Sequence, residues 1–255
     1  MDFAGKRVLV TGGTRGIGRA TVEAFLAAGA RVAVNGRTAE STNKALGELR
    51  AGDRAIAAPG DVGRPDDCRR LVANAVQGLG GLDVLVNNAG WGGSDGPIDR
   101  ITVEEWDRTI NINLRGTFLC IQAALPSLRQ SRGNIVNVAS VLGIRGNGVG
   151  NSDYCASKGG VVNLTRDLSI ELGPDVRVNC LCPGAIDTDM LKDLGRVLGE
   201  GDVGAGYKIL SDEAPLKMVA KPEDMAGAIL FLASDKARFV TGAIFVADGG
   251  IVGKI

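Results

Sequence analysis

The stretch TGGTRGIG, residues 11–18, joins the apolar run RVLVT (7–11) to a helix-length segment that ends at a glycine (18–29). Glycines at such a junction permit a tight turn and a close approach of the backbone to phosphate groups. The N-terminus of the following helix adds unpaired N–H groups and the positive end of the helix dipole. The spacing Gly12-x-x-x-Gly16-x-Gly18 differs from the common GxGxxG pattern, but its place between the first strand and the first helix predicts a phosphate-binding turn.

Short apolar runs alternate with helix-length segments along the rest of the chain. The predicted strands lie within 7–11, 31–35, 54–60, 82–90, 133–140, 176–184 and 243–250, and the main predicted helices within 18–29, 39–50, 64–78, 104–129, 154–172 and 222–233. This alternation implies parallel strands joined by helical crossovers, and the continuous apolar strands fit a sheet that is covered on both faces. The sequence therefore predicts an α/β fold: one domain, residues 1–255, with a Rossmann-type, doubly wound, seven-stranded parallel sheet and helices on both faces.

The composition excludes several classes of function. Lys plus Arg and Asp plus Glu both number 29, so the net charge is zero and no strongly basic surface for nucleic acid is indicated. The chain contains no histidine, which rules out a Ser-His-Asp hydrolase and any zinc site that needs imidazole. We therefore expect neither a nucleic-acid partner nor a metal ion.

Cysteine usage and hydropathy bear on the cellular compartment. The five cysteines show no CxxC spacing, which is typical of a reducing environment. The N-terminal residues MDFAGKRVLV do not resemble a signal peptide, and no run of 18 apolar residues predicts a transmembrane helix. We expect a cytoplasmic protein that makes no membrane contact.

One long segment, residues 187–221, shows no clear helical or strand period. It contains five glycines, which indicate mobility, and it leaves the carboxyl end of a predicted strand. Ligands bind at the carboxyl ends of strands in sheets of this kind. We therefore expect 187–221 to be a lid over the substrate.

The end of the second predicted strand predicts which cofactor is bound. Folds that bind NAD commonly place an acidic residue there to hold the adenosine ribose, whereas this chain has Asn35, Gly36, Arg37 and Thr38. A carboxylate would repel a 2′-phosphate, and a guanidinium can bind one. Arg15, inside the glycine turn, adds a second positive charge. These residues predict a preference for NADP(H) over NAD(H).

Two residues near position 155 offer proton chemistry in a chain without histidine. Tyr154 and Lys158 are one helical turn apart and share a face of the helix predicted at 154–172. Free tyrosine titrates near pH 10, and a neighbouring ammonium group favours the tyrosinate. Tyr154 can therefore give a proton to a carbonyl oxygen in a reduction and take it back in an oxidation.

Several ordered motifs make the chain similar to the short-chain dehydrogenases/reductases over nearly its whole length. They are TGGTRGIG (11–18), GDV (60–62), NNAG (87–90), NINLRG (111–116), NVAS (137–140), YCASK (154–158), PGAIDTDM (183–190) and TGAIFVADGG (241–250). The resemblance implies a strand order of 3-2-1-4-5-6-7. It also implies a catalytic tetrad of Asn113, Ser140, Tyr154 and Lys158, in which Ser140 hydrogen-bonds the substrate oxygen and Asn113 holds a water that links Lys158 to solvent. Asn111 is read as structural.

The cofactor site combines the glycine turn with residues that the resemblance assigns. The predicted cofactor-binding residues are Gly12, Thr14, Arg15, Gly16, Ile17, Gly18, Arg37, Thr38, Asp61, Val62, Asn87, Ala89, Gly90, Tyr154, Lys158, Pro183, Gly184, Ile186 and Thr188. By resemblance, Asp61 and Val62 border the adenine, and Ile186 and Thr188 hold the nicotinamide carboxamide.

The chain looks most like the 3-oxoacyl-[acyl-carrier-protein] reductases, through GNG (146–148) and PGAIDTDM (183–190). The expected function is NADPH-dependent reduction of a ketone. An acyl carrier protein would dock on a basic patch to which Arg129 and Arg132 fit, although residues 171–176 offer no base for a second contact. Loop 141–153 is about one residue longer than in the commonest members and borders the substrate, and Trp91 either lines the pocket or packs beneath it.

Two other functions stay open at this point. One is an NAD-linked dehydrogenase of a sugar, polyol or steroid alcohol. The other, from a different class, is a sensor or scaffold that binds NADP(H) without turnover. Excess apolar residues on the helices predicted at 104–129 and 154–172 and, by resemblance, pairing through the last strand predict a homotetramer.

Overall fold

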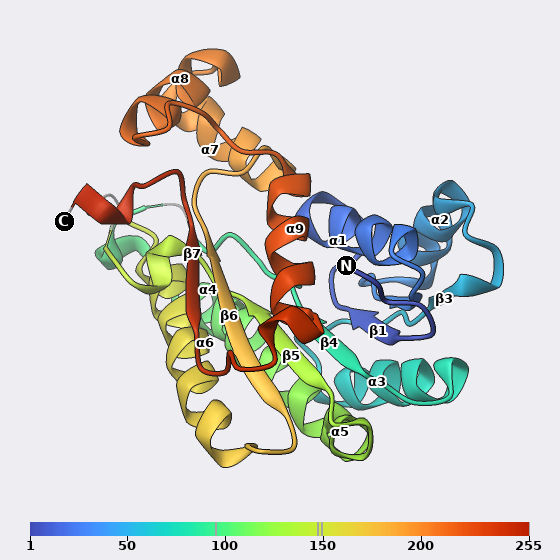
Figure 1. Cartoon of the computed structure of the whole chain (residues 1–255). Coiled ribbons are helices and arrows are strands. Elements are labelled where there is room, and N and C mark those ends of the chain that lie inside the picture. The colour runs from blue at the N-terminus through green and yellow to red at the C-terminus, as the bar shows by residue number, and fades with distance from the viewer. Residues whose placement is uncertain (95, 147, 149, 255) are drawn as a thin grey trace.

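Seven short runs of aliphatic residues form one parallel sheet in the computed structural model, which describes residues 1–94, 96–146, 148 and 150–254 (Figure 1). The strands are β1 (Arg7–Val10), β2 (Arg31–Val34), β3 (Ala55–Ala57), β4 (Val84–Asn87), β5 (Asn134–Val138), β6 (Arg177–Pro183) and β7 (Ile244–Ala247). Their order is β3-β2-β1-β4-β5-β6-β7, and each neighbouring pair is parallel. The predicted fold class and strand order are confirmed.

Helices cover both faces of this sheet. They are α1 (Gly16–Ala27), α2 (Ala39–Leu49), α3 (Pro65–Leu79), α4 (Val103–Ile110), α5 (Gly116–Ser131), α6 (Ser152–Glu171), α7 (Asp189–Leu198), α8 (Val203–Glu213) and α9 (Pro222–Ala233). Successive strand side chains point to opposite faces. Val8 and Val10 therefore join a core with α1 and α9, whereas Leu9 joins a second core with α3 and α5.

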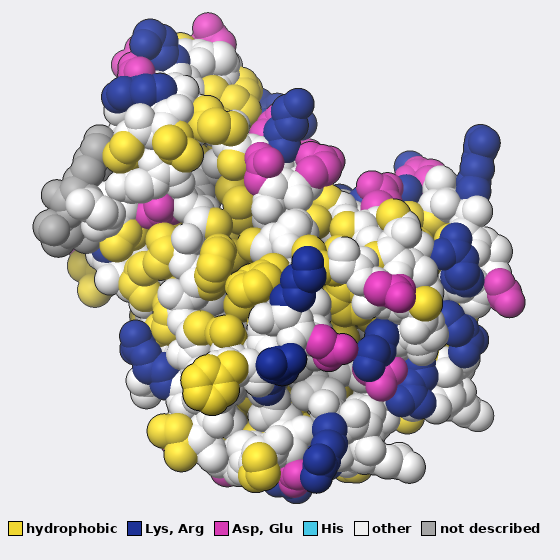
Figure 2. All heavy atoms as spheres, viewed as in Figure 1, with side chains coloured by type: hydrophobic (Ala, Val, Ile, Leu, Met, Phe, Trp, Pro, Cys, Tyr) yellow, Lys and Arg dark blue, Asp and Glu magenta, His cyan; other side chains and the backbone are white. Residues whose placement is uncertain are grey.

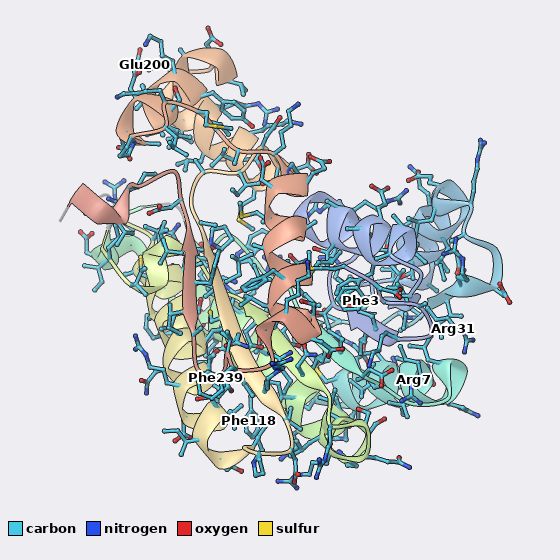
Figure 3. The ribbon with its side chains drawn as sticks, viewed as in Figure 1. Phe3, Arg7, Arg31, Phe118, Glu200 and Phe239 are labelled. Atoms are coloured by element: carbon cyan, nitrogen blue, oxygen red, sulfur yellow. The ribbon has the colours of Figure 1, made fainter. Side chains whose placement is uncertain are left out.

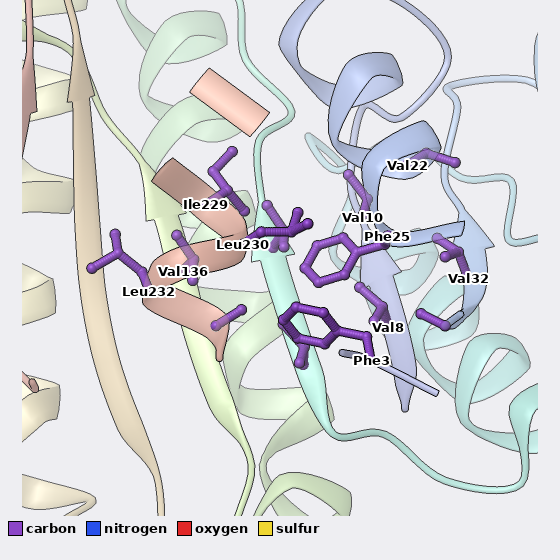
Figure 4. Packing of buried hydrophobic residues seen from close by; sticks show 14 of the residues in the cluster. Phe3, Val8, Val10, Val22, Phe25, Val32, Val136, Ile229, Leu230 and Leu232 are labelled. Atoms are coloured by element: carbon purple, nitrogen blue, oxygen red, sulfur yellow. The ribbon is translucent and has the colours of Figure 1, made fainter. Parts of the chain in front are cut away.

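Figure 4 shows the first of these cores, where Phe3 and Phe25 meet edge to face with ring centres 4.9 Å apart. Edge-to-face packing suits the quadrupoles of two aromatic rings. Phe25 comes from α1, and Ile229 and Leu232 of α9 are fully buried in the same core. This packing holds α1, and with it the glycine turn, firmly against the sheet.

The long helix predicted at 104–129 is present but is interrupted. Residues Asn111–Arg115 form a π-helical turn between α4 and α5. Such turns are rare and occur often at functional sites. This one sets Asn113 facing inward, with only 1% of its surface exposed.

The expectation of an irregular segment at 187–221 was wrong in one respect, because most of it is helical. Helices α7 and α8 form a hairpin that stands away from the body of the molecule (Figure 1). A side chain at Gly206 would overlap the carbonyl oxygen of Gly195, and a Cβ at Gly195 would lie 3.1 Å from the Tyr207 ring. These glycines thus allow the two helices to cross closely. Their role is in packing, whereas the sequence indicates mobility.

Candidate active site and cofactor cleft

The glycine turn has the backbone shape that its sequence predicts. Gly12 and Gly16 have φ values of +63° and +54°, in the region that favours glycine. A Cβ at Gly12 would lie only 2.8 Å from the Cα of Ala89, and one at Gly18 would overlap the carbonyl oxygen of Gly12. The turn is therefore pressed against the end of β4. No side chain caps α1 at Arg15, so the N–H groups of its first turn are left for a ligand.

A hydroxyl and an amide lock this turn to β4. The hydroxyl oxygen of Thr11 accepts hydrogen bonds from the N–H groups of Asn88 (3.0 Å) and Ala89 (3.1 Å). The side-chain amide of Asn88 donates to the carbonyl oxygens of Thr11 (3.0 Å) and Gly12 (3.1 Å). Sequence reasoning missed Asn88, although it lies within the NNAG motif, because its partners are about 77 positions away.

A second amide, on Asn35, joins the ends of three strands. Its oxygen accepts from the N–H of Gly12 (3.1 Å), and its nitrogen donates to the carbonyl oxygens of Ala58 (2.9 Å) and Gly60 (3.0 Å). In the sequence, Asn35 matters only because an acidic residue is absent at the end of the second strand. In the structure it ties together the segments that follow β1, β2 and β3, where the adenosine is expected.

The two arginines predicted to bind phosphate have different surroundings. Arg37 is exposed, and it forms no hydrogen bond or ion pair with the residues that the structure describes. Arg15 donates a 3.3 Å hydrogen bond to a carboxylate oxygen of Asp189, the first residue of α7. Thr38 caps α2 by accepting the N–H of Ser41. Thr14 lies beside Gly36, where a Cβ would be 2.7 Å from its methyl group.

Asp61 and Val62 follow β3 and are fixed by local contacts. A carboxylate oxygen of Asp61 accepts from the N–H of Gly63 (2.9 Å), and the N–H of Asp61 donates to Asp67 (3.0 Å). Val62 is buried, and its carbonyl oxygen would be 2.5 Å from a Cβ at Gly116. The start of α5 therefore packs directly under the expected adenine site.

Lys158, Asn113 and Gly90 converge just beyond the carboxyl end of β4. A Cβ at Gly90 would lie 3.4 Å from the Lys158 ammonium nitrogen and 3.5 Å from the side-chain oxygen of Asn113. Asn87, at the end of β4, donates to the amide oxygen of Asn137 (2.9 Å). Its own amide oxygen is buried and has no partner among the described residues.

The side chain of Asn113 holds the loop that carries Trp91. Its oxygen accepts the Trp91 N–H (2.7 Å), and its nitrogen donates to the Trp91 carbonyl oxygen (2.9 Å) and to the Ser157 hydroxyl (3.0 Å). Both polar groups of its side chain are thus engaged with protein, and its backbone carbonyl oxygen accepts from the Thr117 hydroxyl (2.8 Å).

Tyr154, Lys158 and Ser140 meet where α6 crosses the ends of β5 and β6. The Lys158 ammonium lies 5.6 Å from the centre of the Tyr154 ring and donates to the Val138 carbonyl oxygen (3.0 Å). Burial lowers the pKa of Lys158 to about 8. Burial also raises the pKa of Tyr154 to about 12, and a hydrogen bond with Ser140 partly opposes that rise.

This differs from our expectation that the lysine would lower the pKa of the phenol. The physical reason is desolvation, which outweighs the other influences on Tyr154. The lysine ammonium lies against the ring and is engaged by a backbone carbonyl. Ser140 is nine-tenths buried and begins a short turn by accepting the N–H of Leu142 (3.1 Å).

The residues after β6, which the resemblance assigns to the nicotinamide, lie beside the glycine turn. Pro183 ends β6, and a Cβ at Gly184 would be 2.7 Å from the Cα of Asp248. Ile186 is buried. The Thr188 methyl group would lie 3.2 Å from a Cβ at Gly16.

Two features near the expected substrate side were not resolved by sequence reasoning. Trp91 is 40% exposed, and the Arg108 guanidinium stacks 3.9 Å from its ring centre. Asp153 is fully buried, and one of its oxygens accepts from the Ser94 N–H (3.0 Å), the Ser94 hydroxyl (2.9 Å) and the Thr109 hydroxyl (2.7 Å). No sequence pattern signalled Asp153. Residues 147 and 149, in loop 141–153 and in or beside the GNG motif (146–148), lie outside the described residues.

A family model described as Enoyl-(Acyl carrier protein) reductase matches residues 12–252. The chain belongs to the short-chain dehydrogenase/reductase family. Members of this family use a nicotinamide cofactor, and the chain is an oxidoreductase of the kind that acts on CH–OH or ketone groups.

Individual relatives cover the whole chain. The 3-oxoacyl-[acyl-carrier-protein] reductase of Thermotoga maritima is 38% identical, covering 99% of this chain and 100% of that protein. The 2,5-dichloro-2,5-cyclohexadiene-1,4-diol dehydrogenase of Sphingobium indicum is also 38% identical, covering 98% of each. The crystal structure of levodione reductase has a TM-score of 0.93 at 32% identity, covering 99% of this chain and 100% of that one.

Two further observations concern the residues that the structure describes. No group of three or more Cys, Asp or Glu side chains among them is arranged to hold a metal ion. No helix within the described ranges combines the length and the apolar character needed to cross a membrane.

Proposed function

We propose that the chain reduces a ketone with NADPH, and that the substrate is a 3-oxoacyl compound or a related ketone. The observation that carries this proposal is the convergence of Tyr154, Ser140 and Lys158 at the carboxyl ends of β5 and β6, beside the glycine turn. Ligands bind at this edge of doubly wound sheets. A non-catalytic sensor or scaffold would have no need of a buried lysine, which costs stability.

Tyr154 is the proton donor in this proposal. With its pKa near 12, the phenol keeps its proton at neutral pH and is ready to give it to a carbonyl oxygen. Ser140 provides a second hydrogen bond to that oxygen and stabilises the negative charge that develops there. Lys158, with its pKa near 8, is largely charged at pH 7, and its charge favours the tyrosinate that is left behind.

The cofactor supplies the hydride when it is bound. The residues of this chain fit it, because the first turn of α1 is uncapped and lies behind a turn that only glycines can form. We propose that Gly12, Thr14, Gly16, Ile17 and Gly18 hold its pyrophosphate, and that Arg15 of the same turn contacts the 2′-phosphate. Asp61, Val62, Asn87, Ala89, Gly90, Lys158, Pro183, Gly184, Ile186 and Thr188 would contact the rest of it, with Tyr154 alongside the nicotinamide.

The preference for NADP(H) rests on charge at the end of β2. Residues 35–38 contain no acid, and exposed Arg37 has no recorded partner in the described part of the chain. A free guanidinium can therefore bind a 2′-phosphate without first losing an ion pair, with Thr38 beside it.

We propose that the α7–α8 hairpin is the lid that the sequence predicts at 187–221. Its first residues contact the cleft, since a Cβ at Gly92 would lie 3.4 Å from the Met190 side chain. Its last residue, Glu213, lies 3.8 Å from Arg145 of loop 141–153. Met190 and Trp91 are both partly exposed at this mouth and would line the entry for an apolar part of the substrate.

We further propose a cytoplasmic homotetramer. Large apolar side chains are exposed on or near the elements that the sequence predicted to pair, namely Phe118, Ile170, Phe239, Phe245 and Val246. Phe118 and Phe239, both labelled in Figure 3, are exposed, and apolar side chains gather over the β7 edge in Figure 2. Exposed apolar patches of this kind commonly mark interfaces. Arg129 and Arg132 are exposed as well, and in this proposal they form the basic patch on which an acyl carrier protein would dock.

Oxidation of a cyclic secondary alcohol is the second candidate function. The observation that favours it is the diol dehydrogenase of Sphingobium indicum, which equals the 3-oxoacyl reductase in identity to this chain.

A panel of substrates decides between the two candidates. It should contain 3-oxoacyl thioesters, cyclic diketones, cyclic diols and sugars, each followed at the nicotinamide absorbance with NADPH, NADH and the oxidised forms. The proposal predicts that the largest kcat/KM belongs to a ketone with NADPH. A larger value for an alcohol with NAD⁺ would contradict it and support the second candidate.

A further inference from the structure

One contact ties the proposed lid to the proposed phosphate site. Arg15 donates a 3.3 Å hydrogen bond to Asp189 through one guanidinium nitrogen, and both side chains are more than half exposed. The two residues are 174 positions apart. Arg15 lies in the glycine turn, and Asp189 is the first residue of α7. The neighbouring residues also meet, through Gly16 and Thr188.

The surroundings of Asp189 are partly negative. Asp187 accepts a 2.8 Å hydrogen bond from the Tyr207 hydroxyl. Burial is the largest cause that raises the pKa of that phenol to about 12, and this hydrogen bond and the charges of Asp187 and Asp189 add to the rise. Lys192, on the same helix, approaches Asp189 only to 4.0 Å. A phosphate that reaches Arg15 would therefore approach a carboxylate that is only partly neutralised.

We propose that Asp189 competes with the 2′-phosphate of NADP(H) for Arg15, and so weakens NADPH binding without affecting NADH. This inference rests on the proposed NADP(H) function. Two anionic groups near one guanidinium repel each other, and a single long hydrogen bond between exposed side chains does little to hold Arg15 in a productive position. Repulsion therefore outweighs any pre-ordering of Arg15 by Asp189.

The competition has a consequence for the lid. The hairpin meets the rest of the protein near its ends, through Thr188, Asp189, Met190 and Glu213. Coupling between two binding events is reciprocal. A cofactor phosphate that takes Arg15 from Asp189 thus releases one of these contacts, and α7 becomes freer to move when NADP(H) is bound than when NAD(H) is bound.

The test measures the dissociation constants of NADPH and NADH by fluorescence titration, without substrate. Asp189→Asn should tighten NADPH binding by about 3- to 10-fold, which equals about 0.7–1.4 kcal/mol, and should change NADH binding by less than about twofold. The matched control is Asp193→Asn, which removes the same charge from α7 at a residue that pairs with Arg196. It should leave the ratio of the two constants unchanged.

A double-mutant cycle assigns the effect to Arg15. In an Arg15→Gln background, Asp189→Asn should no longer change NADPH affinity selectively. Equal effects on both cofactors, an effect of Asp193→Asn as large as that of Asp189→Asn, or weaker NADPH binding by Asp189→Asn would each overturn the inference. Failure of the proposed function looks different, because the wild type would then bind NADPH and NADH equally well.

Discussion

The ammonium nitrogen of Lys158 lies 5.6 Å from the centre of the Tyr154 ring, one helical turn away on α6, and the lysine is buried while the tyrosine is partly buried. Burial favours the neutral form of each group. It lowers the pKa of the lysine to about 8 and raises the pKa of the phenol to about 12. The site thus holds a charged group at a cost in stability. Such a cost is typical of a residue that is retained for function.

Lys158→Met should stabilise the protein at neutral pH while it removes activity. The folded pKa of Lys158 lies below its usual value of 10.5, so the unfolded chain binds more protons between pH 8 and 10.5. The penalty is therefore fully present below pH 8 and disappears as the pH rises to 10.5. We expect a gain of about 1–3 kcal/mol in the free energy of unfolding at pH 7 and almost none near pH 10.5.

Denaturant unfolding at the two pH values measures this gain. Lys44→Met, at an exposed position on α2, is the control and should show no comparable pH-dependent gain. Loss of stability in Lys158→Met at pH 7 would show that burial of the charged lysine does not lower the free energy of unfolding.

Arg37→Ala should reduce the preference for NADPH by about 10- to 100-fold, because it removes a charge-assisted contact to the 2′-phosphate. The ratio of kcat/KM values for NADPH and NADH measures it, and Lys44→Ala serves as a control of equal charge. From the sequence alone, Gly36→Asp would be added to repel the phosphate. The structure argues against that change, since a Cβ at Gly36 would lie 2.6 Å from the Thr42 hydroxyl. An unchanged ratio in Arg37→Ala would remove this residue from the phosphate site.

Phe239→Asp should disrupt the tetramer. Phe239 is fully exposed in the isolated chain, so an aspartate there costs little folding stability but introduces a charge into the proposed interface. Light scattering at micromolar concentration should give a tetramer for the wild type and a smaller species for the variant. Ile98→Asp, at another exposed apolar position, should remain tetrameric. A monomeric wild type would refute the assembly.

The parts of the fold that follow from local pattern could be predicted from the sequence. Continuous aliphatic runs such as Val8–Val10 form buried parallel strands, and the glycine turn needs the positive φ angles that Gly12 and Gly16 adopt. The convergence of Tyr154 and Lys158 follows from their helical spacing. These features depend on neighbours within a few positions.

The features that could not be predicted depend on partners far away in the sequence. Asn35 joins three strand ends, and Asp153 is fixed by Thr109, which is 44 positions away. The pKa of Tyr154 depends on burial, which spacing does not reveal. The glycines at 195 and 206 indicate mobility when only the sequence is considered. Their packing role cannot be predicted, because their close approach exists only in the folded hairpin.

Proton donation by Tyr154 is tested by comparing the wild type with Tyr154→Phe, using NADPH consumption with the best ketone of the panel across pH 6–9. Phenylalanine keeps the ring and removes the hydroxyl that we propose as the proton donor. We expect a fall in kcat of about 10²–10⁴-fold, with the NADPH dissociation constant close to that of the wild type. Substantial activity in Tyr154→Phe, with the pH profile of the wild type, would show that the proton comes from another group and that Tyr154 is not the donor.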